Sequence, residues 1–252
     1  MTTVKIFKKP ELTNPILVGG LPGSGYVAKL AVDHLVKELD AKLFGEIFSP
    51  SFPPQVLVRK DGTVELMKNE LYWWRDKKSE TSMIIFTGNT QAVSPEGQYD
   101  IAERVLGAAE EFGVKRIFTI AAFVTGERVE RPRVFATATE SELLDDLRRY
   151  DIVVMKEGNI GGTNGLLFGL AKLREMRGIC LLGETSGYII DAKSAQAVLE
   201  TLTKILDIRV GMSALENRAK ETEAFLRRIQ ELEHREEQPQ PKKGEKGLFY
   251  IG

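Results

Sequence analysis

Residues 16–25 read ILVGGLPGSG, and they set the architecture expected of the whole chain. The apolar run at the start of this stretch predicts a short buried strand, and the glycines after it predict a tight turn. Residues 26–39 follow with apolar side chains at helical spacing. A strand, a glycine-rich turn and a helix in direct succession are typical of proteins in which helices connect the strands of a parallel sheet.

The same alternation continues along the chain. Further strands are predicted at residues 43–48, 82–88, 116–123, 134–138, 151–155 and 178–182, and further helices at 94–112, 141–149, 166–176 and 193–206. This order predicts an α/β fold, a single domain with a largely parallel central sheet flanked by helices. Residues 56–66 predict a hairpin with Asp61 and Gly62 at its turn, which implies an antiparallel edge.

Two shorter features are predicted by local chemistry. Ser94 and Pro95 have the residue types of a helix N-cap and first helical position, so the helix at 94–112 should begin there. Residues 71–74 contain both tryptophans of the chain and predict a short strand or an aromatic packing patch. An exposed position for these rings would indicate a subunit contact.

The composition changes after the last predicted strand and helix. We expect a core domain at residues 1–211, a charged amphipathic helix at 212–237 and a flexible linker with a docking tail at 238–252. The helix carries one narrow apolar stripe, which should pack against another subunit or against its own domain. The stripe is Leu215, Ala219, Thr222, Leu226, Ile229 and Leu232.

The overall composition limits the function classes. The chain has 252 residues, 42 % of them hydrophobic and 28 % charged, and its formal net charge is −1. This balance predicts a globular protein and gives no basic excess for binding nucleic acid. No apolar run reaches transmembrane length and the first residues lack the apolar region of a signal peptide, so we expect a cytoplasmic protein. The single cysteine, Cys180, lies in an apolar run and should be buried.

The loop at residues 20–27 lies where a phosphate-binding loop would lie, between a strand and a helix. Its first and last glycines have the required spacing, but Tyr26 and Val27 occupy the positions of the lysine and the hydroxyl residue that bind phosphate and magnesium. Residues 23–28 also fit a loose dinucleotide pattern, for which Glu46 is a poor ribose partner. The alternative is a tight turn whose glycines permit close packing.

Catalytic groups are sparse. A nucleophilic triad of Ser24, His34 and an aspartate would lack the usual G-x-S-x-G motif around its serine. Glu157 and Glu184 follow strands, where α/β enzymes place active sites, but the default expectation is a solvated loop acid. The second glycine cluster, GNIGGTNG at residues 158–165, could bind an anion or cap the next helix. No histidine or cysteine cluster has metal-ligand spacing, so we expect no metal and no catalytic residue.

The carboxyl-terminal segment is apolar and follows a polar tether at residues 238–246. It either folds back onto its own domain or docks into a pocket of a partner. The docking hypothesis assigns partner binding to Leu248, Phe249, Tyr250, Ile251 and Gly252.

Three segments together resemble the archaeal members of the proteasome assembly chaperone family. They are residues 17–28 (LVGGLPGSGYVA), 158–167 (GNIGGTNGLL) and 183–187 (GETSG). The resemblance implies a phosphorylase-like α/β core and an ATP-independent chaperone without a cofactor. It further implies that the chain forms a homo-oligomer, which we expect to be a tetramer. It also implies contact with the α ring of the 20S proteasome. Similar sequences have been described as ATP-grasp-like ligases, which leaves a nucleotide-dependent ligase or a hydrolase as the alternative.

Members of this family and proteasome activators often end in a hydrophobic residue, a tyrosine and one final residue. In such proteins the tail enters a pocket between α subunits, where a lysine pairs with the terminal carboxylate. Phe249, Tyr250 and Ile251 match that order, but Gly252 makes the tyrosine third from the end instead of second. The resemblance therefore predicts docking, with a changed position of the carboxylate.

Overall fold

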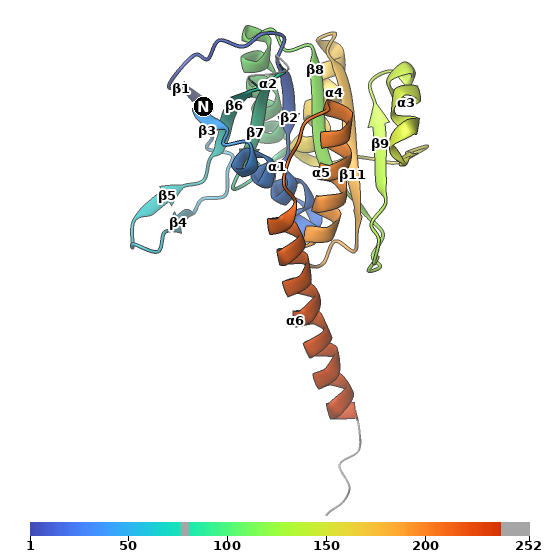
Figure 1. Ribbon diagram of the computed structural model, residues 1–252. Helices are drawn as coiled ribbons and strands as arrows, with labels where there is room; N and C mark the ends of the chain where they lie inside the picture. Colours follow the sequence, from blue (N-terminus) through green and yellow to red (C-terminus); the bar gives the residue numbers. More distant parts are fainter. Residues whose placement is uncertain (77–80, 238–252) are drawn as a thin grey trace, which may run out of the picture.

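The computed structural model describes residues 1–76 and 81–237, which form a nine-stranded sheet with helices on both faces and a separate two-stranded ribbon (Figure 1). In spatial order the sheet contains β1 (Thr3–Ile6), β3 (Lys42–Phe48), β6 (Asn69–Arg75), β7 (Ser82–Gly88), β2 (Ile16–Gly19), β8 (Arg116–Val124), β11 (Arg177–Thr185), β9 (Val134–Ala138) and β10 (Ile152–Val154). The ribbon contains β4 (Val56–Val58) and β5 (Val64–Leu66). The helices are α1 (Val27–Glu38), α2 (Pro95–Glu111), α3 (Ser141–Leu147), α4 (Gly162–Leu173), α5 (Ala192–Leu206) and α6 (Ser213–Glu237), with 3-10 turns at Ser24–Tyr26 and Arg148–Tyr150.

The centre of the sheet is parallel. β7, β2, β8 and β11 pair with one another in parallel, while β6 and β9 border this centre in antiparallel orientation. Every residue of β2 and of β7 is buried, which is the pattern of strands covered on both faces. The predicted α/β domain with a largely parallel centre and an antiparallel edge is confirmed.

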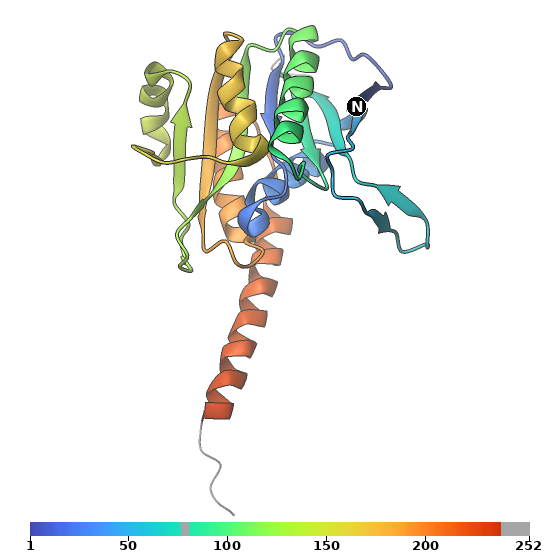
Figure 2. The same ribbon diagram turned by 180° about the vertical axis from the view of Figure 1, so that it is seen from behind.

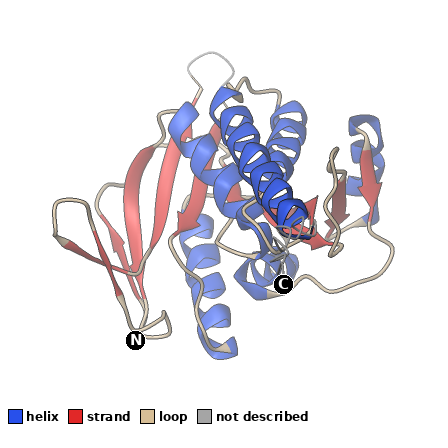
Figure 3. Cartoon of the chain, turned by 90° about the horizontal axis from the view of Figure 1, so that it is seen from below, coloured by secondary structure: helices blue, strands red, loops and turns tan. Residues whose placement is uncertain are grey.

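Helices cover the two faces of the sheet in separate layers (Figures 2 and 3). α1, α5 and the start of α6 cover one face, and α2 and α4 cover the other. Neighbouring strand residues serve opposite faces, so Phe118 packs on the α1 side and Ile117 on the α2 side. Cys180 is buried as predicted, and no helix in the described ranges is both long and apolar enough to span a membrane.

Local signals placed several element ends correctly. The Ser94 side chain accepts a hydrogen bond from the Gly97 backbone N–H at 3.1 Å, so the predicted N-cap is confirmed. Gly62 adopts a φ of 82° in the turn of the ribbon, a conformation that glycine reaches at low cost. The tryptophans of residues 71–74 lie in β6 and are half-buried against the two core layers, so they are packing residues of this domain.

One predicted helix start was wrong, and one strand was not predicted. α4 begins at Gly162, four residues before the predicted start at Leu166. The Thr163 N–H at its first turn donates to Oε1 of Gln91 at 2.8 Å, a partner 72 positions away that no local pattern reveals. The edge strand β1 was also missed, because a short and largely exposed strand carries no clear alternation.

α6 leaves the body of the domain and projects from it (Figure 1). Leu215 and Ala219, the first two residues of the predicted stripe, are buried against the core, so packing against its own domain is confirmed for the base of this helix. Farther along, Phe225 is 64 % exposed. The side chains of Ile229 and Leu232, at the far end of the stripe, lie outside the described part of the structure.

Candidate functional site

The loops that carry the three glycine motifs meet at the carboxyl edge of the parallel strands. Residues 20–25 follow β2, and residues 183–187 end β11 and begin the next loop. The third motif, 158–165, enters α4, whose first turn reaches the loop after β2. This edge is where α/β enzymes bind ligands, so the hydrogen-bond partners of its polar groups decide whether a binding position is open there.

Asn164 joins two of these motifs. The Leu21 N–H donates to its Oδ1 at 2.9 Å, and its Nδ2 donates to the Leu21 carbonyl oxygen at 3.2 Å. Both bonds are buried, and they pair the Asn164 amide with the backbone N–H and carbonyl of a single residue in the loop after β2. The asparagine therefore occupies the Leu21 N–H, a donor of the kind that a phosphate-binding loop would direct at a ligand.

Gln91, in the loop after β7, makes a second bridge. Its Nε2 donates to the Pro22 carbonyl oxygen at 2.5 Å, and its Oε1 accepts the Thr163 N–H at 2.8 Å. One amide side chain thus binds both glycine-rich loops. Neither Gln91 nor Asn164 stood out in the sequence as a residue that holds this edge together, because each partner is distant along the chain.

The 183–187 motif is joined to the loop after β2 through Asp191, which lies just before α5. The Asp191 N–H donates to the Gly25 carbonyl oxygen at 2.8 Å, while its carboxylate accepts the Thr185 hydroxyl at 2.8 Å. The same carboxylate caps α5 by accepting the Ser194 N–H at 2.9 Å. Gly25 has a φ of 61°, and a Cβ there would lie 2.8 Å from Thr185 Oγ1. The glycine is therefore required by the turn and by the close approach of β11.

These contacts account for the glycine motifs as packed joints between loops. At Gly20 a Cβ would lie 2.6 Å from Val32 Cγ2, so the glycine allows α1 to approach β2. Tyr26 takes a left-handed conformation with a φ of 53° at the position of the absent phosphate lysine, and its side chain is exposed. Among the described residues, no group of three or more His, Cys, Asp and Glu side chains is placed to hold a metal.

The default expectation for Glu184 was wrong. Its side chain is 3 % exposed and forms an ion pair with Arg133, whose Nη2 lies 2.5 Å from Oε1 and whose Nε lies 2.9 Å from Oε2. The Arg133 N–H adds a further bond at 3.1 Å. Hydrogen bonding to Arg133 holds the pKa of the Glu184 carboxyl below its usual range, despite the opposing effect of burial. Arg133 lies 51 positions away along the chain, so the pair had no local signal.

The other candidate catalytic residues are not brought together into a site. His34 Nε2 donates to the Gly211 carbonyl oxygen at 2.5 Å, which ties α1 to the segment before α6. In a catalytic triad one ring nitrogen faces the serine and the other binds an aspartate. With Nδ1 bound to an aspartate, Nε2 would have to face the serine, but here Nε2 is bound to Gly211. Glu157 is exposed in the loop before α4, as a solvated loop acid is expected to be.

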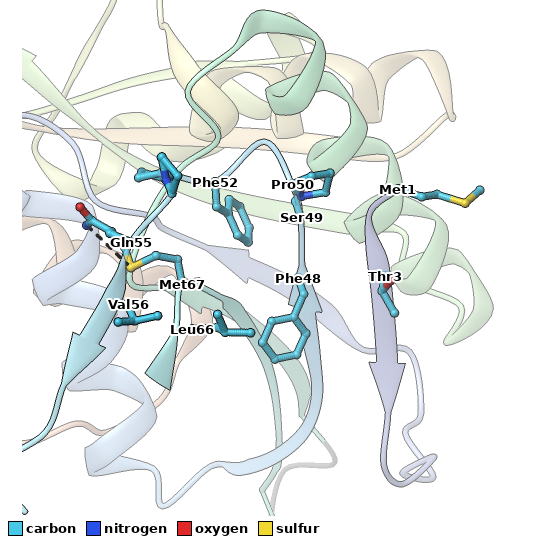
Figure 4. Close-up of a pocket in the computed structure, with 12 residues that line it drawn as sticks. Met1, Thr3, Phe48, Ser49, Pro50, Phe52, Gln55, Val56, Leu66 and Met67 are labelled. Carbon is cyan, nitrogen blue, oxygen red and sulfur yellow. Dashed lines mark hydrogen bonds between the residues drawn. The ribbon is translucent and has the colours of Figure 1, made fainter. Parts of the chain in front are cut away.

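An apolar hollow of about 680 Å³ opens beside the ribbon (Figure 4). Its walls come from the first residues of the chain, from the end of β3 with the proline-rich loop after it, and from the ribbon. The lining residues are Met1, Thr3, Phe48, Ser49, Pro50, Phe52, Pro53, Pro54, Gln55, Val56, Leu66 and Met67. The hollow was not predicted, because its walls come from segments that meet only in the folded chain.

The ribbon itself presents apolar side chains to solvent. Val56 pairs with Leu66 and Val58 with Val64, so these four side chains share one face of the ribbon. All four are exposed. Lys68 fixes the base of the ribbon by binding Glu46 of the sheet at 2.5 Å. An exposed apolar face next to an apolar hollow is typical of a surface that contacts another protein.

The predicted docking residues Leu248, Phe249, Tyr250, Ile251 and Gly252 lie outside the described residues. The structure describes the helix that precedes them. Lys193 at the start of α5 forms an ion pair with Glu223, and this contact joins the buried Leu215 and Ala219 in attaching α6 to the body.

Comparison with known proteins identifies the family. The sequence profile of the PAC2 family matches residues 17–230, which is most of the chain. The chain belongs to the PAC2 family. Within this family it is 41 % identical to an uncharacterised protein of Methanocaldococcus jannaschii over 254 residues, covering 99 % of this chain and 97 % of that protein.

Two solved structures of this PAC2 fold come from Pyrococcus furiosus. PbaB, an archaeal proteasome activator, is 43 % identical, covers 91 % of this chain and 98 % of its own, and superimposes with a TM-score of 0.86. PbaA, an archaeal homolog of proteasome-assembly chaperone, is 26 % identical over 92 % of this chain and 97 % of its own, with a TM-score of 0.74. The family expected from the three glycine segments is therefore confirmed.

Proposed function

We propose that this PAC2 protein is a proteasome assembly chaperone or activator-like adaptor, which binds the α ring of the 20S proteasome through its carboxyl-terminal tails without ATP. The observation that carries the proposal is the similarity to PbaB, at 43 % identity over 91 % of this chain. The carboxyl edge agrees with it, since the backbone of its glycine loops is bonded to Asn164 and Gln91, which leaves the motifs explained without a nucleotide.

The geometry of α6 suits the presentation of a tail. The helix rises about 1.5 Å per residue, so it extends roughly 20 Å from Glu223, which contacts the body, to its end at Glu237. A helix that projects from the body in this way suits the presentation of the proposed docking residues to a partner.

The chemistry of the proposed docking residues fits a pocket that is apolar and ends in a cation. Phe249 and Tyr250 supply aromatic surface, and the terminal carboxylate supplies a charge-assisted contact to a lysine of the α ring. Gly252 moves that carboxylate one residue away from the tyrosine. A homo-oligomer would carry several tails, so modest single contacts would add up through avidity. The exposed ribbon offers apolar surface for contacts within such an oligomer.

The experiment is native mass spectrometry of the full chain mixed with archaeal 20S α subunits. Deleting Leu248 to Gly252 should abolish the complex and leave the circular dichroism spectrum and oligomeric state unchanged. The matched control replaces Lys242 and Lys243 in the tether with serine, which keeps the docking residues and should preserve binding. Undiminished binding by the truncated chain would refute the role of the tail.

A second variant tests the register of the tail. Deleting Gly252 alone moves Tyr250 to the second position from the end, as in the family pattern. We expect tighter binding to the α ring, because the tyrosine and the carboxylate can then be seated together. Weaker binding would show that the final glycine belongs to the docking contact.

A further inference from the structure

A small hollow lies at the amino edge of the sheet, at the opposite end of the strands from the glycine loops. It opens between the sheet, α3 with the turn that follows it, and the last part of α5. Its volume is about 150 Å³. The lining residues are Arg116, Phe118, Leu143, Asp146, Leu147, Arg149, Tyr150, Arg177, Ile179 and Ile205.

The floor of this hollow is apolar. Phe118 and Ile179 come from neighbouring parallel strands, and both are buried. Leu143 and Leu147 of α3 close one side and are also buried. Such a floor favours the apolar part of a ligand, because contact removes apolar surface from water on both partners.

Three arginines line the same hollow. Arg116 and Arg177 are register partners at the first positions of β8 and β11, so their backbones lie about 4.8 Å apart. Each lies two residues before a floor residue of its own strand, Phe118 or Ile179, so both arginines belong to the same face as the floor. Arg149, from the turn after α3, has its guanidinium carbon 5.1 Å from the centre of the Tyr150 ring, which orients the group.

The positive charge of this cluster is only partly compensated. Arg177 Nε lies 3.5 Å from Glu140 Oε2, a long ion pair that leaves its other guanidinium donors available. Within the described part of the chain, neither Arg116 nor Arg149 has a carboxylate within ion-pair distance. Asp146 is the one acid among the lining residues, against three guanidinium groups.

We propose that this hollow binds a small amphipathic anion, with a carboxylate or phosphate head between the arginines and a short apolar body on the floor. Guanidinium groups bind such heads through paired N–H donors. The volume limits the ligand, since cavities of this size admit a molecule about as large as benzene, whereas pockets for larger ligands span about 300–1,000 Å³. A chain of several carbons or a single ring fits this limit.

The test uses hexanoate as the probe and methyl NMR of the isoleucine-labelled full chain as the readout. Hexanoate should shift the methyl signals of Ile179 and Ile205 in a saturable manner. Hexanol and hexylammonium, which keep the apolar body but lack the negative head, should bind at least about tenfold more weakly, which corresponds to one charge-assisted contact. Inorganic phosphate and phenyl phosphate, run in parallel, distinguish a phosphate head from a carboxylate.

Two variants assign the effect to the arginines. The double variant Arg116→Gln, Arg149→Gln should weaken hexanoate binding by about tenfold or more. Both side chains are exposed, so the rest of the NMR spectrum should remain that of the folded protein. Arg104→Gln is the matched control, because that arginine is an exposed residue of α2 paired with Asp100 and should leave binding unchanged. Equal binding of hexanol and hexanoate, unchanged binding by the double variant, or saturation by phosphate without an apolar body would each overturn the proposal.

Discussion

Two glycines of α4, four residues apart, should respond to the same substitution with opposite signs. Gly165→Ala places a Cβ 2.7 Å from the carbonyl carbon of Ile160 and still closer to its oxygen. Carbon atoms in contact normally lie about 3.5–4.0 Å apart. The loop before α4 would therefore have to move by about 1 Å. A Cβ at Gly169 meets nothing within 4 Å.

The expected magnitudes follow from these distances. Alanine gains about 0.8–1.0 kcal/mol over glycine inside a helix, and Gly169→Ala should show that gain. At Gly165 the same gain is opposed by an overpacking cost of about 3 kcal/mol, at the upper end of the usual range because the obstacle is backbone. The net expectation is a loss of about 2 kcal/mol, so the two variants should differ by about 3 kcal/mol.

Urea denaturation of both variants and of the parent chain measures these free energies of unfolding. In thermal melts of a domain of this size, about 3 kcal/mol corresponds to a separation of roughly 6–12 °C in Tm. Gly165→Ala should also raise hydrogen exchange in residues 158–165, since the loop is displaced from its contacts. Equal stability of the two variants would refute the claim that Gly165 is present for the close approach of Ile160.

Three further predictions concern buried groups and α6. Burial raises the pKa of the Cys180 thiol to about 12, so iodoacetamide at pH 8 should label it only after denaturation, as read by mass spectrometry. Arg133→Met leaves the Glu184 carboxylate buried without its partner and should cost about 2–3 kcal/mol at pH 7 in urea melts. The pKa of Glu184 is lowered in the folded state, so the paired carboxylate stabilises the fold fully above the ordinary carboxyl pKa. That stabilisation is lost as the pH falls through the lowered pKa. The difference in unfolding free energy between parent and variant should therefore shrink below about pH 4.5. Leu215→Ala removes a buried contact at the base of α6 and should raise hydrogen exchange there, whereas Phe225→Ala, at a 64 % exposed position of the same helix, should not.

The order of strands and helices was predictable because each element carries its own pattern. The apolar run of β7 and the Ser94 cap of α2 are local signals, and both were placed correctly. The turn of the ribbon was likewise fixed by Asp61 and Gly62.

The candidate sites were less predictable because they depend on contacts between distant positions. Asn164 and Leu21 are 143 residues apart, and nothing near either residue reveals that they pair. The Glu184 environment depends in the same way on Arg133. The arginine hollow requires knowledge that β8 lies beside β11 in a register that aligns Arg116 with Arg177.

The glycine loops show why a spacing pattern alone was insufficient. A phosphate loop and a packed joint between a strand and a helix both need glycine where the backbone turns sharply and another atom approaches closely. The two cases differ in which atoms contact the loop, a bound phosphate or another part of the protein. Here the carbonyl and N–H of Leu21 face the amide of Asn164, and Tyr26 stands where the cation for phosphate would be. Two features therefore distinguish a structural joint from a nucleotide site here. The phosphate-binding lysine and hydroxyl side chains are absent from the glycine loop, and a distant amide binds the loop backbone instead.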